Sequence, residues 1–262
     1  QSRKHNLMIN MPAEVFNEKA IIEKVDYWTI NADFMIMGVM VDDASRWDIL
    51  PVSPLCIDVD LWKRGTELRK ADGVNEAVTI VHSPNHRGFK GTEFILQAVQ
   101  ELKDEGLKID FVLLEKVPNE VVRNTLATTA DILVEQIIFT GYGLSGVEGM
   151  ASGIPVMSNW EHKDISTLFR RYSYLNECPI VSTSPETIKD NLRKLITNPN
   201  LRQRLGDAGR EYVEKYNSYT AFSALFGEIE KKIWKEDPDC DPMNFFNSTN
   251  QKSYNHKYPI IK

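Results

Sequence analysis

Short, continuous apolar runs and longer segments with helically spaced apolar residues succeed one another from about residue 76 onward. The apolar runs predict buried strands at 78–81, 111–114, 132–134, 154–157 and 179–181. The spaced segments predict helices at 92–104, 118–129, 145–152, 199–216 and 219–235, and Ser184-Pro185 opens one more. Strands without polar alternation, separated by helices, indicate a parallel sheet covered on both faces. The predicted fold class is therefore α/β, a Rossmann-like parallel sheet with helices on both sides.

The part before residue 76 is less regular. Residues 13–28 predict an amphipathic helix, and residues 34–37 predict a short apolar strand. Residues 41–62 contain two prolines and several aspartates, which is typical of a linker. The tail from 237 to 262 is polar and aromatic without periodicity, so the pattern assigns it no role.

Composition narrows the class of protein. The chain has 262 residues, of which 42% are hydrophobic and 26% are charged, and these values exclude disorder and a collagen-like structure. A net charge of −6 argues against a general nucleic-acid binder, so an anionic ligand needs a local basic site. The three cysteines are widely spaced and form no Cys-x-x-Cys, which indicates a reducing compartment without a disulfide framework. With no apolar run of spanning length, we expect a cytoplasmic protein. Because the chain does not begin with Met, it is interpreted as a piece of something longer.

The first candidate site follows the strand at 78–81. The loop from His82 to Gly91 carries Arg87, Lys90 and two histidines, and a helix begins directly after it. Cations beside a helix N-terminus suit a phosphate or pyrophosphate. A solvated loop whose cations offset nearby acids is an equally open interpretation.

The second candidate site joins the strand at 132–134 to a short helix. Gly141 and Gly143 let the backbone approach a ligand closely. Glu148 borders the apolar face of the helix, where a carboxylate needs a partner such as a ribose diol. Ser145-x-x-Glu148 also fits a capping box, and spacing alone favours that interpretation.

The same stretch spells a dinucleotide fingerprint, Gly141-x-Gly143-x-x-Gly146, with Glu161 lying 20 residues after Gly141. It predicts a nicotinamide-dependent oxidoreductase as the alternative function. The helix has room for only about two turns, and the motif follows the third strand of the unit instead of the first. Both features argue against that function.

A third strand end, Glu115 to Pro118, offers Val117 and free backbone groups to a nucleotide base, although a simple turn is the commoner explanation. No Ser/His/Asp arrangement and no cluster with metal-ligand spacing is recognised, so no metal or cofactor is expected.

Several segments in order resemble one family, namely 55–62 (LCIDVDLW), 82–102 (HSPNHRGFKGTEFILQAVQEL), 130–160 (ADILVEQIIFTGYGLSGVEGMASGIPVMSNW), 178–188 (CPIVSTSPETI) and 201–218 (LRQRLGDAGREYVEKYNS). Together they resemble the nucleotide-sugar-binding half of GT-B glycosyltransferases, the retaining group 1 family. The resemblance implies a hexosyltransferase that moves a sugar from a nucleotide-diphosphate sugar to a glycan or small-molecule acceptor. It also implies a bacterial polysaccharide pathway and a cytoplasmic location, peripheral at the inner face of the membrane.

The resemblance implies a role for each matching residue. Arg87 and Lys90 would be catalytic, because they would neutralise the pyrophosphate and stabilise the departing nucleotide diphosphate. Glu148 would hold the ribose hydroxyls. The remaining substrate-binding residues would be the amides of Gly141, Tyr142 and Gly143, the backbone near Val117 for the base, Thr140 and His82.

Two positions depart from the family pattern. Thr140 stands where the family has a first glutamate that contacts the sugar, and Glu135, five residues earlier, is not assumed to replace it. The family's basic residue five positions before the lysine falls on Asn85, two places from Arg87.

The resemblance divides the chain into residues 1–52, a remnant of the acceptor-side domain with the linker, residues 53–236, the nucleotide-sugar-binding domain, and the tail 237–262. We therefore expect the chain to bind a nucleotide-sugar but to transfer sugar poorly or not at all by itself. We expect exposed apolar area around residues 1–50 and on the last helix, and with it self-association as a homo-oligomer. A non-catalytic binding module is a further alternative.

Overall fold

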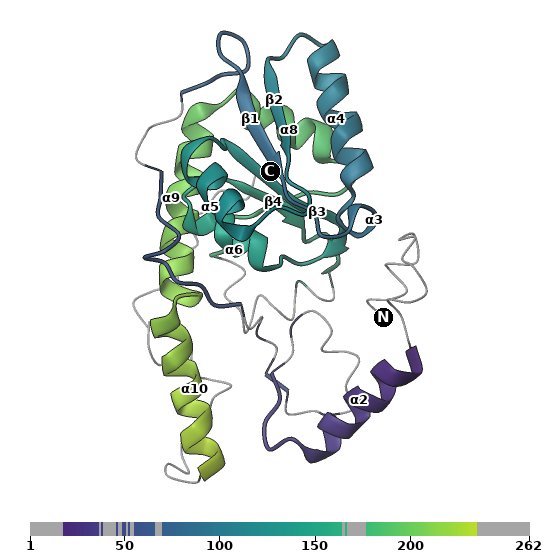
Figure 1. Cartoon of the computed structure of the whole chain (residues 1–262), viewed down its shortest axis with the longest axis vertical. Coiled ribbons are helices and arrows are strands. Elements are labelled where there is room, and N and C mark those ends of the chain that lie inside the picture. The colour runs from purple at the N-terminus through teal and green to yellow at the C-terminus, as the bar shows by residue number, and fades with distance from the viewer. Residues whose placement is uncertain are drawn as a thin grey trace.

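The structure, a computed structural model, describes residues 18–36, 38, 46, 49–50, 52, 55–65, 70–163, 166 and 177–234. Its centre is a parallel sheet in the order β2-β1-β3-β4-β5 (Figure 1). The strands are β1 Val78–His82, β2 Ile109–Leu113, β3 Ile132–Thr140, β4 Val156–Asn159 and β5 Val181–Ser182. The helices are α2 Glu18–Asn31, α3 Arg87–Lys90, α4 Thr92–Asp104, α5 Asn119–Thr128, α6 Leu144–Ala151, α8 Ile188–Ile196, α9 Pro199–Tyr216 and α10 Tyr219–Trp234. The predicted α/β class is confirmed.

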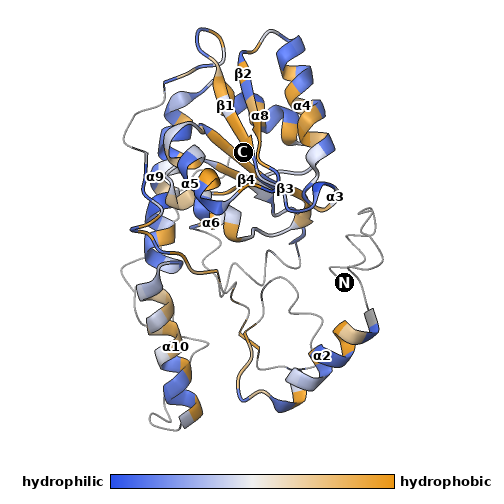
Figure 2. Cartoon of the chain, in the orientation of Figure 1, coloured by the Kyte–Doolittle hydropathy of each residue, from blue (hydrophilic) through white to orange (hydrophobic). Residues whose placement is uncertain are grey.

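Each face of the sheet carries its own apolar core. On one face, α4, α8 and the start of α9 pack against β1, β3 and β4 around Ile80 and Ile132. On the other face, α5, α6 and the end of α9 pack around Val81 and Leu133. Ile132 and Leu133 are neighbours in one strand, and they enter opposite cores because strand side chains alternate. Figure 2 shows the result, apolar strands between helices that are polar on their outer sides.

Several boundaries differ from the sequence prediction. Residues 185–187 form a turn in which the Ser184 amide donates to Thr187 Oγ1, so α8 begins only at Ile188. Pro118 is the N-cap of α5 and not its first helical residue. The predicted strand at 34–37 is represented, among the described residues, by a single bridge from Ile36 to Leu50. In the N-terminal part, the predicted helix is confirmed from Glu18 onward, and its earlier residues lie outside the described part.

The segment before the sheet is hydrogen-bonded to Asn217, which lies between α9 and α10. The Ile57 amide donates to the Asn217 carbonyl at 2.8 Å, and Asn217 Nδ2 donates to the Leu55 carbonyl at 2.7 Å. Earlier in the chain, Leu50 and Val52 form a small apolar cluster with α10. This helix extends away from the sheet (Figure 1).

Large apolar side chains are exposed on α2 and α10, as expected for these segments. Ile30 at the end of α2 is 80% exposed, and Trp234 at the end of α10 is 74% exposed. None of the helices in the described ranges combines the length and the apolar character needed to cross a bilayer.

Helix α9 packs closely against the end of α6 through Gly206. A Cβ at this position would overlap the Gly153 carbonyl oxygen, which is backbone and cannot move aside. Gly206→Ala is therefore expected to lower the free energy of unfolding by about 1–3 kcal/mol, measured by urea denaturation. Gly227→Ala in α10 is the matched control, because among the residues that the structure describes a Cβ there meets nothing within 4 Å. The control should be neutral or stabilising by up to about 1 kcal/mol, and equal effects of the two variants would contradict this packing.

Candidate functional site

The candidate site lies at the carboxyl ends of β1 and β3, which are neighbours in the sheet. From β1 the chain runs to β2 on one side, whereas β3 lies on the other side. This reversal of strand order is the place where open parallel sheets bind ligands. The short helix α3 follows β1, and its C-cap is Gly91, whose φ of 79° is left-handed. Because a Cβ there would lie 2.6 Å from the Ile137 side chain, glycine lets α3 sit directly on β3.

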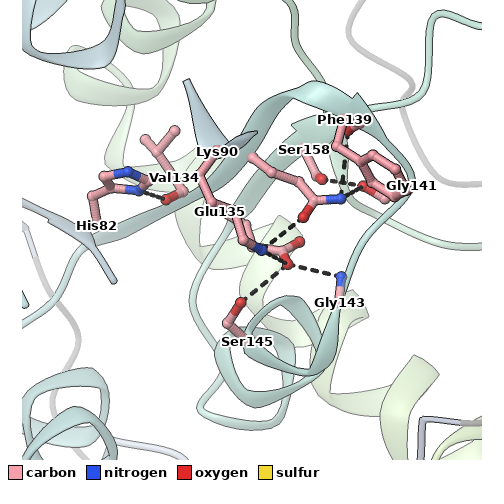
Figure 3. A network of polar contacts seen from close by, with 10 residues as sticks. His82, Lys90, Val134, Glu135, Phe139, Gly141, Gly143, Ser145 and Ser158 are labelled. Carbon is pink, nitrogen blue, oxygen red and sulfur yellow. Dashed lines mark hydrogen bonds and ion pairs between the residues drawn. The ribbon is translucent and has the colours of Figure 1, made fainter. Parts of the chain in front are cut away.

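Lys90, the last residue of α3, is held by two adjacent residues of β3. Its Nζ donates to Glu135 Oε1 at 3.1 Å and to Gln136 Oε1 at 2.7 Å (Figure 3). Adjacent strand residues normally point to opposite faces. The pairing of β3 with β4 shifts register on both sides of Gln136, however, and such an irregularity re-aims side chains. Both polar groups therefore reach the same ammonium.

Glu135 also fixes the glycine loop that follows β3. Its Oε1 accepts the Gly143 amide at 2.7 Å and the Ser145 hydroxyl at 3.0 Å. Its Oε2 has no hydrogen-bond partner within the described part of the chain and lies 2.8 Å from the place of a Cβ on Gly146. Glycine at 146 thus leaves the room that this carboxylate needs.

The amide nitrogen of Gln136 binds the same glycine loop. Its Nε2 donates to the Gly141 carbonyl at 2.8 Å, and Ser158 Oγ donates to that carbonyl at 2.5 Å. An ammonium only donates and a carbonyl only accepts, so the orientation of the Gln136 amide is fixed by its partners. Together, Glu135 and Gln136 connect Lys90 to both ends of the Gly141–Gly143 turn.

The Lys90–Glu135 ion pair is largely withdrawn from water. The Lys90 side chain is 10% exposed and the Glu135 side chain 1% exposed. Burial of either charge alone would cost several kcal/mol. The pair keeps both charged groups in place at the edge of the sheet.

Glu148 lies in α6 and is buried. Its Oε1 accepts Asn119 Nδ2, from the first turn of α5, at 3.1 Å. Burial raises the pKa of Glu148 to about 7, and the nearby Glu135 charge raises it further, against the lowering effect of Asn119. The capping box that spacing favours does not form, because Gly143 is the N-cap and the Ser145 hydroxyl turns to Glu135. Glu148 is therefore a buried acid that is not committed to the helix start.

His82 ends β1 and is completely buried. Its Nδ1 lies 2.7 Å from the Val134 carbonyl and must donate to it, so Nε2 accepts the Thr92 hydroxyl at 2.8 Å. Burial lowers the pKa of His82 to about 4, which leaves the ring neutral at neutral pH. With both nitrogens engaged inside the protein, the predicted contact of His82 with substrate is not supported. His82 instead ties β1 to β3 and α4.

Arg87 begins α3 and turns toward the end of β2. Its guanidinium donates to Glu93 Oε1 at 2.9 and 2.8 Å and to Glu115 Oε2 at 3.0 Å. The hydrogen bond to Glu93 and the Glu115 charge raise the pKa of Arg87. The structure thus places Lys90 beside the glycine turn, the second candidate site of the sequence. It places Arg87 beside Glu115, at the third candidate site. Because this network is exposed, an anionic ligand can compete for Arg87 at little cost.

The glycine turn offers fewer amides than predicted. The Gly141 amide donates to the Asn159 carbonyl at 2.7 Å, and the Gly143 amide donates to Glu135, so these two are committed within the protein. Their predicted contact with the diphosphate is not supported by this geometry. Tyr142 lies between them, and its ring packs edge-on against Trp160.

The other two predicted binding residues are Thr140, at the end of β3, and Val117, which follows the end of β2. Thr140 ends β3 and pairs with Asn159 of β4. Val117 is half-buried and packs against the core that contains α5 and α6. The direct ligand contacts expected of both remain predictions.

A comparison with known families finds one similarity within this chain. Residues 96–212 match the family described as "Glycosyl transferases group 1". The matched stretch, a little under half of the chain, is similar to this family. The matched range includes the network around Glu135 and Gln136 as well as Glu148, although it begins after Lys90.

Individual proteins and solved structures are also similar to this chain. An uncharacterized glycosyltransferase of Methanocaldococcus jannaschii is 26% identical over 147 residues, which are 49% of this chain and 41% of that protein. The chain thus spans about two fifths of the length of this relative. The solved GtfA/B complex aligns with a TM-score of 0.54 and 12% identity, over 81% of this chain and 48% of that chain. WaaG, a glycosyltransferase involved in lipopolysaccharide biosynthesis, aligns at a TM-score of 0.45 and 17% identity, over 69% and 58% of the two chains.

The oxidoreductase alternative finds no support among these relatives. The fingerprint glycines have other uses, since Gly143 caps α6 and Gly146 makes room for Glu135. Glu161, the acid expected on a ribose, is exposed and accepts the Thr187 hydroxyl at 3.2 Å.

Sequence reasoning missed Gln136 and Asn119, and it left Glu135 without a role. A signal for two of them was present, because Glu135-Gln136 interrupts the otherwise apolar strand ILVEQIIF. Buried polar groups in such a strand require partners. Asn119 gave no comparable signal, as it follows a turn where amides are common.

Proposed function

We propose that this chain binds the nucleotide diphosphate of a sugar donor and that the whole protein transfers the sugar to an acceptor with retention of configuration. The observation that carries the proposal is the Lys90 ammonium, fixed beside the glycine turn at the reversal of strand order. The glycosyltransferase relatives support the same reaction class.

The diphosphate would lie at the ends of β1 and β3. Within the described ranges, Lys90 uses two of its three N–H donors, so one remains there for a phosphate oxygen. Arg87 would leave its exposed carboxylates and supply a second cation. Charge that develops on the departing nucleotide diphosphate would be stabilised by these preorganised donors.

The nucleoside would lie on the α6 side of the diphosphate. Ionised Glu148 would accept both ribose hydroxyls, with Asn119 orienting its carboxylate. The base would rest on the backbone near Val117, beyond the end of β2. Thr140 would face the sugar, where its hydroxyl is a weaker ligand than the glutamate of the family pattern.

Calorimetric titration with uridine, guanosine and adenosine diphosphates and with NAD tests this function. We expect one nucleoside diphosphate to bind, Lys90→Met and Glu148→Ala each to weaken it at least about tenfold, and NAD to bind no better than adenosine diphosphate. Glu161→Ala is the matched acidic control and should bind as the wild type does. A preference for NAD that depends on Glu161 would favour an oxidoreductase, and no binding of any ligand would favour a non-catalytic module.

A cytoplasmic location, attachment to the inner face of a membrane and self-association stay part of the proposal. The exposed apolar residues of α2 and α10 support the last two. Analytical ultracentrifugation with and without vesicles measures both.

A further inference from the structure

We infer that Glu135 and Gln136 are positioning residues that together set the diphosphate subsite by fixing the Lys90 ammonium and the glycine turn relative to each other. The inference rests on the proposed function, because it assumes that Lys90 meets the diphosphate.

The first observation is the burial of the dipeptide. Glu135 and Gln136 are each 3% exposed, so neither side chain is placed to bind a ligand directly. Their contacts are directed inward, to Lys90, to the Gly141 carbonyl, to the Gly143 amide and to Ser145. Because both side chains are buried, they act on a bound diphosphate through Lys90, whose ammonium they hold.

The second observation is that the two side chains make different contacts. Glu135 neutralises Lys90 and caps the end of the turn that leads into α6. Gln136 carries no charge, yet it makes the shorter contact with Lys90 and joins it to the start of the turn. Removing Gln136 therefore disturbs the geometry of the ammonium without changing the charge of the site.

This difference makes Gln136 the sharper test. Without its amide, Lys90 keeps its ion partner but can rotate, so its remaining donor no longer points in one direction. We expect Gln136→Ala to weaken nucleoside diphosphate binding about tenfold relative to the parent nucleoside. In a Lys90→Met background, the same change should have no effect on that ratio, since the group that it positions is gone.

The experiment is a double-mutant cycle on the folded chain. Uridine, guanosine and adenosine diphosphates and their nucleosides are titrated by calorimetry into the wild type, Gln136→Ala, Lys90→Met and the double variant. Asn191→Ala is the matched control, because it removes another buried amide, one that bonds the Ser182 carbonyl and Thr183 in a different part of the sheet. If Gln136→Ala does not fold, Gln136→Met retains the length of the side chain and replaces it.

The outcomes separate this inference from the proposed function. A tenfold loss that disappears in the Lys90→Met background supports the inference. Diphosphate binding that needs Lys90 but is unchanged in Gln136→Ala overturns it and leaves the proposed function standing. A loss of equal size in both backgrounds, or in Asn191→Ala as well, indicates a purely structural role and also overturns it. A wild type that binds no diphosphate overturns both.

Discussion

Lys90→Met is expected to weaken binding of the nucleoside diphosphate about 100-fold while leaving binding of the parent nucleoside unchanged. The ammonium supplies the charged hydrogen bond to the phosphates, and such bonds are among the strongest in proteins. The same change leaves Glu135 buried without its counter-ion, so the free energy of unfolding should fall by about 3–5 kcal/mol. Calorimetry and urea denaturation measure the two effects.

A second variant separates these two consequences of losing Lys90. Lys90→Met combined with Glu135→Gln removes both charges and should regain most of the stability but none of the diphosphate affinity. Lys189→Met is the matched control, because Lys189 pairs with Glu101 and Glu105 at the surface. It should change stability by no more than about 1 kcal/mol. Full diphosphate affinity in Lys90→Met would contradict the assignment of Lys90.

Binding of the parent nucleoside is expected to weaken as the pH falls below 7, because Glu148 then becomes protonated. Its pKa is raised to about 7 by burial. The ionised carboxylate accepts hydrogen bonds from both ribose hydroxyls. In the protonated form, one of the two oxygens carries a proton and is a donor. Affinity should fall by up to about tenfold for each pH unit below this pKa. The nucleoside is the right probe, since it carries no phosphate that titrates in the same range.

The free energy of unfolding should depend on pH in the opposite direction to nucleoside affinity. It should fall as the pH rises, through the same residue, Glu148. The folded pKa of Glu148, about 7, lies above its ordinary value of 4.5. The group therefore contributes stability that is fully present below the ordinary value and is lost as the pH rises through about 7. Glu148→Gln should remove the pH dependence of nucleoside binding and be more stable than the wild type above pH 7, by up to about 3 kcal/mol. Nucleoside affinity that is constant from about pH 5 to pH 8 in the wild type would contradict this role.

The sequence predicted the sheet because its strands are short, apolar and buried on both faces, which is a local and strong signal. It also predicted that the ends of the first and third strands carry the chemistry, since Lys90, Gly141 and Glu148 are conspicuous there. Residue type and strand position were sufficient for the sheet and for the places of these residues at its strand ends, whereas their part in the chemistry stays a prediction.

The partners of these residues could not be predicted, because they depend on irregular backbone and on long-range contacts. Strict alternation would separate Glu135 from Gln136, but the register shift in β3 turns both toward Lys90. The Ser145 capping box failed for a similar reason, as a buried carboxylate ten residues away competes for the hydroxyl. Arg87 is drawn to Glu115, which lies on the neighbouring strand end and 28 residues away in the chain.

A crystal structure of the chain with the nucleoside diphosphate that binds best would show whether Lys90 and Glu148 hold the two ends of this ligand. We expect a phosphate oxygen within hydrogen-bond distance of Lys90 Nζ and both ribose hydroxyls on the Glu148 carboxylate. A nucleotide bound with neither residue in contact would contradict it.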